Sequence, residues 1–131
     1  YNDTAATIPD AMISALNSFS QPIILIAGGT DKTLDFTLAG KEIAEKVKEV
    51  IFLKGDATEK LIGEIRKNLP AAEKNKEFLI VDSMDKAVEE AKNKAQAGEV
   101  VLLSPGAASF GLFANEFDRG DKFKEAVLRQ G

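Results

Sequence analysis

The residues best suited to bind a ligand follow four short apolar runs. Gly28-Gly29-Thr30-Asp31-Lys32-Thr33 follows the first run, and Ser104-Pro105-Gly106-Ala107-Ala108-Ser109 follows the fourth. The paired glycines permit a tight turn and a close approach by a ligand, and Lys32 adds a positive charge. The small residues of the second stretch leave room for a ligand to reach backbone N–H groups, and Ser109 offers a hydroxyl that can donate and accept. These groups suit a small anion.

Each of these residues also has a simpler interpretation, which spacing alone favours. Lys32 is then a solvated side chain after an ordinary strand-to-helix turn, and Ser109 caps a helix. Thr7, three residues before Asp10, is expected to cap the first helix, a role that leaves its hydroxyl proton to donate. Arg119 is expected in a surface ion pair with a neighbouring aspartate. The phenylalanines at positions 110, 113, 117 and 123 are expected to pack in the core or between domains.

The composition excludes several classes of chemistry. With no Cys, His or Trp, the chain cannot supply a thiol nucleophile, a thiolate or imidazole metal site, a disulfide, or a Ser-His-Asp triad. Neither G-x-x-x-x-G-K-[ST] nor a G-x-G-x-x-G after a strand occurs, so this chain cannot cradle ATP unaided. The net charge of −4 argues against nucleic-acid and anionic-membrane partners.

The four apolar runs predict the strands that position these residues. They cover residues 22–27, 50–53, 77–81 and 100–103. Because the runs are continuous rather than alternating, both faces of each strand should be buried, as in a parallel sheet covered by helices. Amphipathic helices are expected between the runs, ahead of the first and at the C-terminus.

The predicted fold class is therefore α/β, an open, doubly wound, mostly parallel sheet with helices on both faces, Rossmann-like. A further strand between Leu112 and Arg119 or near Tyr1 remains open. In such a sheet, ligands bind beyond the carboxyl ends of the strands. No apolar run approaches the roughly 20 residues that span a bilayer, and no leader is evident, so we expect a cytoplasmic protein. The start at Tyr1, directly in a polar motif, suggests one domain, residues 1–131, from a longer chain.

Three ordered motifs resemble the C-terminal domain of a Mur ligase, most closely the D-glutamate-adding branch. They are Asn2-Asp3-Thr4-Ala5-Ala6-Thr7, then Ala27-Gly28-Gly29-Thr30-Asp31-Lys32, then Leu103-Ser104-Pro105-Gly106-Ala107-Ala108-Ser109-Phe110 with Phe117-Asp118-Arg119-Gly120. The resemblance implies an ATP-dependent amide ligase of peptidoglycan synthesis, which adds D-glutamate to UDP-N-acetylmuramoyl-L-alanine. An N-terminal domain would hold the UDP-sugar, and a central domain would hold ATP and magnesium through a P-loop. This chain would bind D-glutamate and close over ATP, and we expect it to be a monomer and inactive alone.

The resemblance also implies roles for individual residues. By motif position, Lys32 would pair with a D-glutamate carboxylate, and Thr7 and Ser109 would hydrogen-bond the other carboxylate region. The backbone of Phe117 would help to hold D-glutamate, and Asp3 would approach the nucleotide ribose. A doubly negative amino acid needs such a cation and such donors at one rim of the sheet. No catalytic or metal-ligating residue is expected in this chain.

The sequence departs from the family pattern at three places. Ala5 replaces a lysine, and Gly111 replaces an aspartate. The aromatic residue before the Arg-Gly pair is displaced by one, so that Glu116 stands where the family has the aromatic residue and Phe117 follows it. Two other hypotheses remain open. One is a non-catalytic Rossmann-like module that binds a small anion or a protein. The other is the equivalent domain of another Mur-type ligase or of a folylpolyglutamate synthetase.

Overall fold

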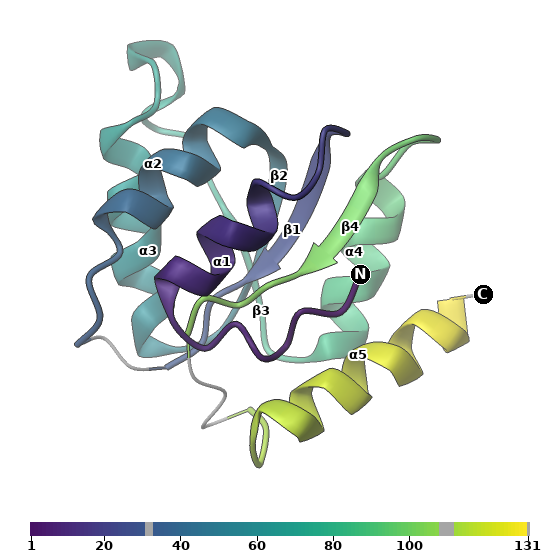
Figure 1. Ribbon diagram of the computed structural model, residues 1–131. Coiled ribbons are helices and arrows are strands. Elements are labelled where there is room, and N and C mark those ends of the chain that lie inside the picture. Colours follow the sequence, from purple (N-terminus) through teal and green to yellow (C-terminus); the bar gives the residue numbers. More distant parts are fainter. Residues whose placement is uncertain (31–32, 108–111, 131) are drawn as a thin grey trace.

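A parallel sheet lies at the centre of the protein in a computed structural model, which describes residues 1–30, 33–107 and 112–130 (Figure 1). Its four strands, in the order β3-β2-β1-β4, are β1 (Ile23–Ala27), β2 (Val47–Leu53), β3 (Leu79–Val81) and β4 (Val100–Leu103). The chain adds β2 and β3 on one side of β1 and then returns to add β4 on the other side. The sheet order thus reverses at β1, and the predicted doubly wound α/β fold is confirmed.

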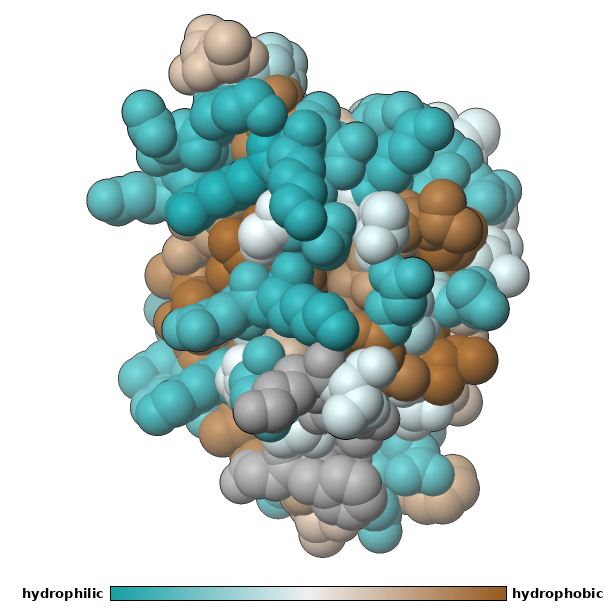
Figure 2. Space-filling model, turned by 90° about the vertical axis from the view of Figure 1, so that its left-hand side faces the viewer, coloured by the Kyte–Doolittle hydropathy of each residue, from teal (hydrophilic) through white to brown (hydrophobic). Residues whose placement is uncertain are grey.

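Helices cover both faces of this sheet. One layer contains α1 (Pro9–Leu16), α2 (Thr37–Lys46) and α3 (Asp56–Lys67), and the other contains α4 (Met84–Lys94) and α5 (Glu116–Gln130); a short 3-10 helix, η1 (Ala71–Glu73), follows α3 (Figure 1). The side of the molecule where α2 and α3 lie presents mostly hydrophilic side chains to solvent (Figure 2). Among the described residues, no helix is both long enough and apolar enough to cross a membrane.

Alternate residues of β1 face the two helical layers. Ile23 and Leu25 pack in the cluster with α1, α2 and α3, whereas Ile24 and Ile26 pack in the cluster with α4 and α5. The prediction that both faces are buried is therefore confirmed for β1. It is wrong for β3, where Leu79 and Ile80 are 38% and 44% exposed, because β3 pairs only with β2 in the described part of the sheet.

The first three residues extend the sheet beyond β4. The Leu103 N–H donates to the Tyr1 carbonyl at 2.9 Å, and the Asp3 N–H donates to the Leu103 carbonyl at 2.7 Å. Asn2 forms a parallel bridge with Leu103. The possible strand near Tyr1 is thus an isolated bridge rather than a strand. The other expected location, residues 112–119, contains a turn and the start of α5.

The start of α1 differs from the sequence prediction. Ile8, not Thr7, is the N-cap residue, and no side chain caps the helix. Pro9 occupies the first turn, where its fixed φ and missing N–H favour helix initiation without a capping hydroxyl. The Thr7 N–H instead donates to the Ala5 carbonyl at 2.8 Å. The capping role expected for Thr7 is therefore wrong.

Candidate functional site

The segments that lead to the predicted site residues meet at one edge of the sheet. The Gly28 N–H donates to the Pro105 carbonyl at 3.0 Å, which joins the ends of β1 and β4. The Gly106 N–H donates to the Ala6 carbonyl at 2.8 Å, which adds the opening segment. In open α/β sheets, ligands bind beyond the carboxyl ends of the strands where the strand order reverses. These three segments surround that point.

The predicted D-glutamate residues continue from these contacts. Thr7 is half-buried and directly follows Ala6. Lys32 follows Gly28 by four residues and Ser109 follows Gly106 by three, and both lie outside the described residues. The structure therefore brings together the segments of the predicted site, and the roles of the three side chains stay predictions.

The Gly28-Gly29 turn packs against the start of α3. Gly28 has a φ of 99°, and a Cβ there would lie 2.4 Å from the Thr58 Oγ1 atom. The Gly29 N–H donates to Thr58 Oγ1 at 3.1 Å, and the Gly29 carbonyl accepts from the Ala57 N–H at 3.0 Å. The sequence predicts that the paired glycines let a ligand come close. In the structure, the backbone at the start of α3 and the buried Thr58 hydroxyl lie against them.

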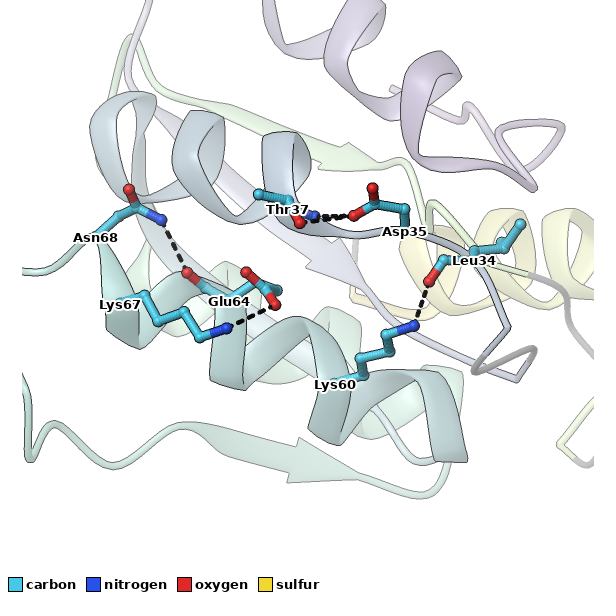
Figure 3. A network of polar contacts seen from close by, with 7 residues as sticks. All are labelled: Leu34, Asp35, Thr37, Lys60, Glu64, Lys67 and Asn68. Atoms are coloured by element: carbon cyan, nitrogen blue, oxygen red, sulfur yellow. Dashed lines mark hydrogen bonds and ion pairs between the residues drawn. The ribbon is translucent and has the colours of Figure 1, made fainter.

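The far side of the same loop is also attached to α3 (Figure 3). The Lys60 ammonium donates to the Leu34 carbonyl at 2.6 Å. One oxygen of Asp35 accepts from the backbone N–H and hydroxyl of Thr37, at 2.9 and 2.6 Å, where α2 begins. These bonds from Thr37 lower the pKa of the Asp35 carboxyl. Helix α3 therefore holds the loop that contains Lys32 on both sides.

Asp3 is fixed at the end of β4. Its Oδ2 atom accepts a hydrogen bond from the Ser104 hydroxyl at 2.8 Å, and Ser104 is fully buried. Its backbone N–H is bound to the Leu103 carbonyl. Asp3, which the motif resemblance assigns to the nucleotide, thus has a defined position at the same edge as Thr7.

Arg119 is buried, and the expectation of a surface ion pair is wrong. Its guanidinium donates through Nε to the Thr4 hydroxyl at 3.1 Å, through Nη2 to the Thr4 carbonyl at 2.7 Å, and through Nη1 to the Ala107 carbonyl at 2.9 Å. Burial lowers its pKa to about 10, against the opposing charge of Glu116. The guanidinium therefore donates to two carbonyl groups and one hydroxyl, and not to an aspartate at the surface.

The residues around Arg119 strengthen this junction. The Thr4 hydroxyl donates to the Glu116 carbonyl at 2.6 Å, and the Asn2 side-chain amide donates to the Gly120 carbonyl at 3.1 Å. A Cβ on Gly120 would lie 2.6 Å from Thr4 Cγ2. The Arg-Gly pair thus joins α5 to the opening motif, a role that its position in the sequence did not indicate.

The phenylalanines have different environments. Phe123 is buried against α4, and Phe113 packs at the edge of the same cluster, which confirms core packing for these two. Phe117 lies in the first turn of α5 and is 71% exposed. Phe110 lies outside the described residues. The proposed contact of Phe117 with D-glutamate stays a prediction.

The described residues enclose little space at the turn after β1, beside Arg119. A cavity of about 10 Å³, lined among others by Gly29, Lys54, Phe113 and Arg119, holds about one water. A ligand as large as glutamate does not fit in this cavity. Residues 1–30, 33–107 and 112–130 contain no cluster of three or more acidic, His or Cys side chains that could hold a metal ion.

Comparison with known proteins identifies the family. The profile described as "Mur ligase, glutamate ligase domain" matches residues 1–107, which include the opening motif and all four strands. The chain belongs to this family. It is 48% identical over 126 residues to "UDP-N-acetylmuramoylalanine--D-glutamate ligase" of Roseiflexus sp. (strain RS-1), covering 96% of this chain and 26% of the relative.

Other members of the family carry the same name. The identity is 44% over 130 residues with the protein of Borreliella afzelii (strain PKo), and 39% over 129 residues with that of Clostridium botulinum (strain Kyoto / Type A2). These matches cover 97% and 98% of this chain, and 27% and 28% of the relatives. The chain thus spans about a quarter of the length of the curated relatives it matches.

Proposed function

We propose that this chain is the D-glutamate-binding domain of a longer ATP-dependent ligase that joins D-glutamate to UDP-N-acetylmuramoyl-L-alanine in the cytoplasm. The observation that carries the proposal is the 48% identity, over 96% of this chain, to a relative named as this ligase. Because the chain spans about a quarter of that relative, the remaining functions are assigned to other parts of the longer protein.

The proposed reaction has two steps. ATP phosphorylates the carboxylate of the UDP-sugar-linked alanine, and the amino group of D-glutamate then attacks the acyl phosphate and releases phosphate. We assign ATP and magnesium mainly to a central domain, since this sequence has no P-loop motif. We assign the UDP-sugar to an N-terminal domain. This chain presents D-glutamate and closes over the nucleotide.

The rim of the sheet provides the proposed D-glutamate site. Lys32 pairs with one carboxylate, and the hydroxyls of Thr7 and Ser109 hydrogen-bond the other carboxylate region, with help from the Phe117 backbone. The meeting of the three segments at the Gly28–Pro105 and Gly106–Ala6 hydrogen bonds supports this assignment. The second oxygen of Asp3 accepts from the nucleotide ribose, while Ser104 holds the first.

The strength of these contacts explains why other domains are needed. Charge-assisted hydrogen bonds contribute about 1.5–3 kcal/mol each, so two or three contribute roughly 3–9 kcal/mol. Association and desolvation oppose binding by roughly 4–15 kcal/mol. D-glutamate therefore binds weakly to an open rim, and closure against the other domains supplies the remaining contacts.

The test is a Lys32→Ala substitution in the full-length enzyme, with phosphate release measured against D-glutamate concentration. Loss of one charge-assisted contact of about 1.5–3 kcal/mol should raise the Michaelis constant for D-glutamate roughly 10- to 100-fold. The matched control is Lys41→Ala, which removes the same charge from an exposed position in α2 and should leave that constant unchanged. An unaltered Michaelis constant in Lys32→Ala removes Lys32 from the site. Failure of the wild-type enzyme to use D-glutamate refutes the proposed function.

A further inference from the structure

Among the described residues, Arg119 is the positively charged side chain that is fully buried. It joins two segments of the proposed site. Its hydrogen bonds to Thr4 and Ala107 end on neutral oxygens. Two of these belong to Thr4, in the opening segment, and one to Ala107, in the loop after β4. A buried guanidinium is costly unless its donors are satisfied, so these three acceptors must stay in place around it.

The shape of arginine suits this position better than that of lysine. A guanidinium is planar and presents donors in fixed directions, whereas an ammonium is a single point charge on a flexible stem. In Arg119, Nε and Nη2 face Thr4 while Nη1 faces Ala107. A rigid group therefore fixes the distance between the two backbone segments.

We propose that Arg119 is a positioning residue for D-glutamate: through Thr4 and Ala107 it fixes the separation between the opening segment, which continues to Thr7, and the loop after β4. The inference rests on the proposed function. Thr7 follows Thr4 by three residues, and Ser109 follows Ala107 by two. Arg119 does not touch the substrate in this arrangement.

Other contacts keep the junction folded when the guanidinium is changed. The Thr4 hydroxyl binds the Glu116 carbonyl, Asn2 binds the Gly120 carbonyl, and the Gly106 N–H binds the Ala6 carbonyl. An Arg119→Lys substitution keeps the positive charge and part of the length of the side chain. It should therefore loosen the separation of the two segments rather than unfold the domain.

A positioning role and a merely structural role affect kinetics differently. The carboxylates of D-glutamate are bound equally in the ground state and the transition state, because the reacting atom is the amino nitrogen. Weaker binding of these carboxylates therefore raises the Michaelis constant and leaves kcat nearly unchanged. A merely structural defect lowers the amount of active enzyme, so kcat falls while the Michaelis constant stays the same.

The experiment compares three variants of the full-length enzyme. Arg119→Lys should raise the Michaelis constant for D-glutamate about 10-fold or more, with kcat within about 3-fold and the constant for the UDP-sugar substrate unchanged. Thr4→Val keeps the size of the side chain but removes one acceptor of the guanidinium, together with the hydrogen bond from that hydroxyl to the Glu116 carbonyl, so it should raise the same constant about 3-fold. Arg129→Lys is the control on α5, where the exposed arginine pairs with Asp85 and Glu125, and it should change neither constant.

Hydrogen–deuterium exchange gives a second measurement that needs no substrate. Arg119→Lys should speed amide exchange in residues 1–7 and 104–107 and leave β2 unchanged. If exchange does not change, Arg119 does not fix these segments and the inference is overturned. If exchange rises but the Michaelis constant does not, Arg119 is structural only, which also overturns it. If Arg119→Lys fails to fold, the Thr4→Val result decides. If the wild-type enzyme does not use D-glutamate as a substrate, the proposed function is refuted. The exchange measurement still tests whether Arg119 holds residues 1–7 and 104–107 together.

Discussion

Gly55 joins β2 to α3, and its substitution tests how tightly the turn after β1 is held. Its φ of 166° and ψ of 164° describe extended backbone, which alanine adopts without strain. A Cβ at this position would lie 2.0 Å from the Gly29 carbonyl oxygen, 2.4 Å from its carbon and 2.9 Å from its Cα. All three neighbours are backbone atoms, so no side-chain rotation relieves the clash. Gly55→Ala must therefore move the Gly29 turn.

The cost of this movement follows from the contacts it disturbs. Overpacking costs about 1–3 kcal/mol. The Gly29 turn also makes hydrogen bonds with Ala57 and Thr58, and each contributes about 0.5–1.5 kcal/mol. Gly55→Ala should thus lower the free energy of unfolding by about 2–6 kcal/mol. The matched control is Gly63→Ala in α3, where a Cβ meets nothing within 4 Å. It should raise the free energy of unfolding by about 0.5–1 kcal/mol, the helical preference for alanine over glycine.

The assay is urea unfolding of the two variants and the wild-type chain, with the slope m required to stay constant. For a chain of 131 residues, 1 kcal/mol corresponds to about 4 °C in Tm, so Gly55→Ala should lose roughly 8 °C or more while Gly63→Ala gains a few degrees. A Gly55→Ala stability within about 0.5 kcal/mol of wild type would show that the Gly29 turn is free to move. The account of how the Lys32 loop is held would then be wrong.

Two further predictions concern activity and ionisation. This chain alone, supplied with ATP, magnesium, D-glutamate and the UDP-sugar substrate, should release phosphate no faster than a protein-free blank, because it has no P-loop; release above the blank contradicts the division of roles among domains. The Lys48 ammonium lies 2.7 and 3.0 Å from the two oxygens of Glu99 and lowers the pKa of that carboxyl, with help from the Gln96 N–H. Lys48→Met should raise the Glu99 midpoint in an NMR titration, and an unmoved midpoint refutes the contact. Because the folded pKa lies below the unfolded value, the contact stabilises the fold above the unfolded pKa, and this contribution is lost as pH falls through the folded pKa.

Continuous apolar runs predicted the strands because burial on both faces leaves no polar positions. The same signal missed the start of β2, which begins at Val47 rather than at Val50. Lys48 and Glu49 interrupt the apolar pattern there, yet the backbone still pairs with β1, Ile23 opposite Val47. Pairing at the end of a sheet does not require burial, so composition alone could not place this boundary.

The sequence identified the segments of the site better than their internal contacts. Motif order placed the opening segment, the turn after β1 and the loop after β4 together, and the structure joins them by backbone hydrogen bonds. Arg119 was misinterpreted because its partners, Thr4 and Ala107, are 115 and 12 residues away and two of the three acceptors are carbonyl groups. Every residue has a carbonyl, so no pattern of side chains reveals such a partner. The contacts of Lys32 and Ser109 with D-glutamate stay predictions.

The pairing of residues 1–3 with β4 affects how the protein behaves in solution. It covers the outer edge of β4 with the hydrogen bonds of Tyr1 and Asp3. If these residues were trimmed, β4 would present unpaired N–H and C=O groups to solvent, and exposed strand edges recruit strands from other molecules. Solubility at high concentration should therefore depend on three residues that contribute little to the core.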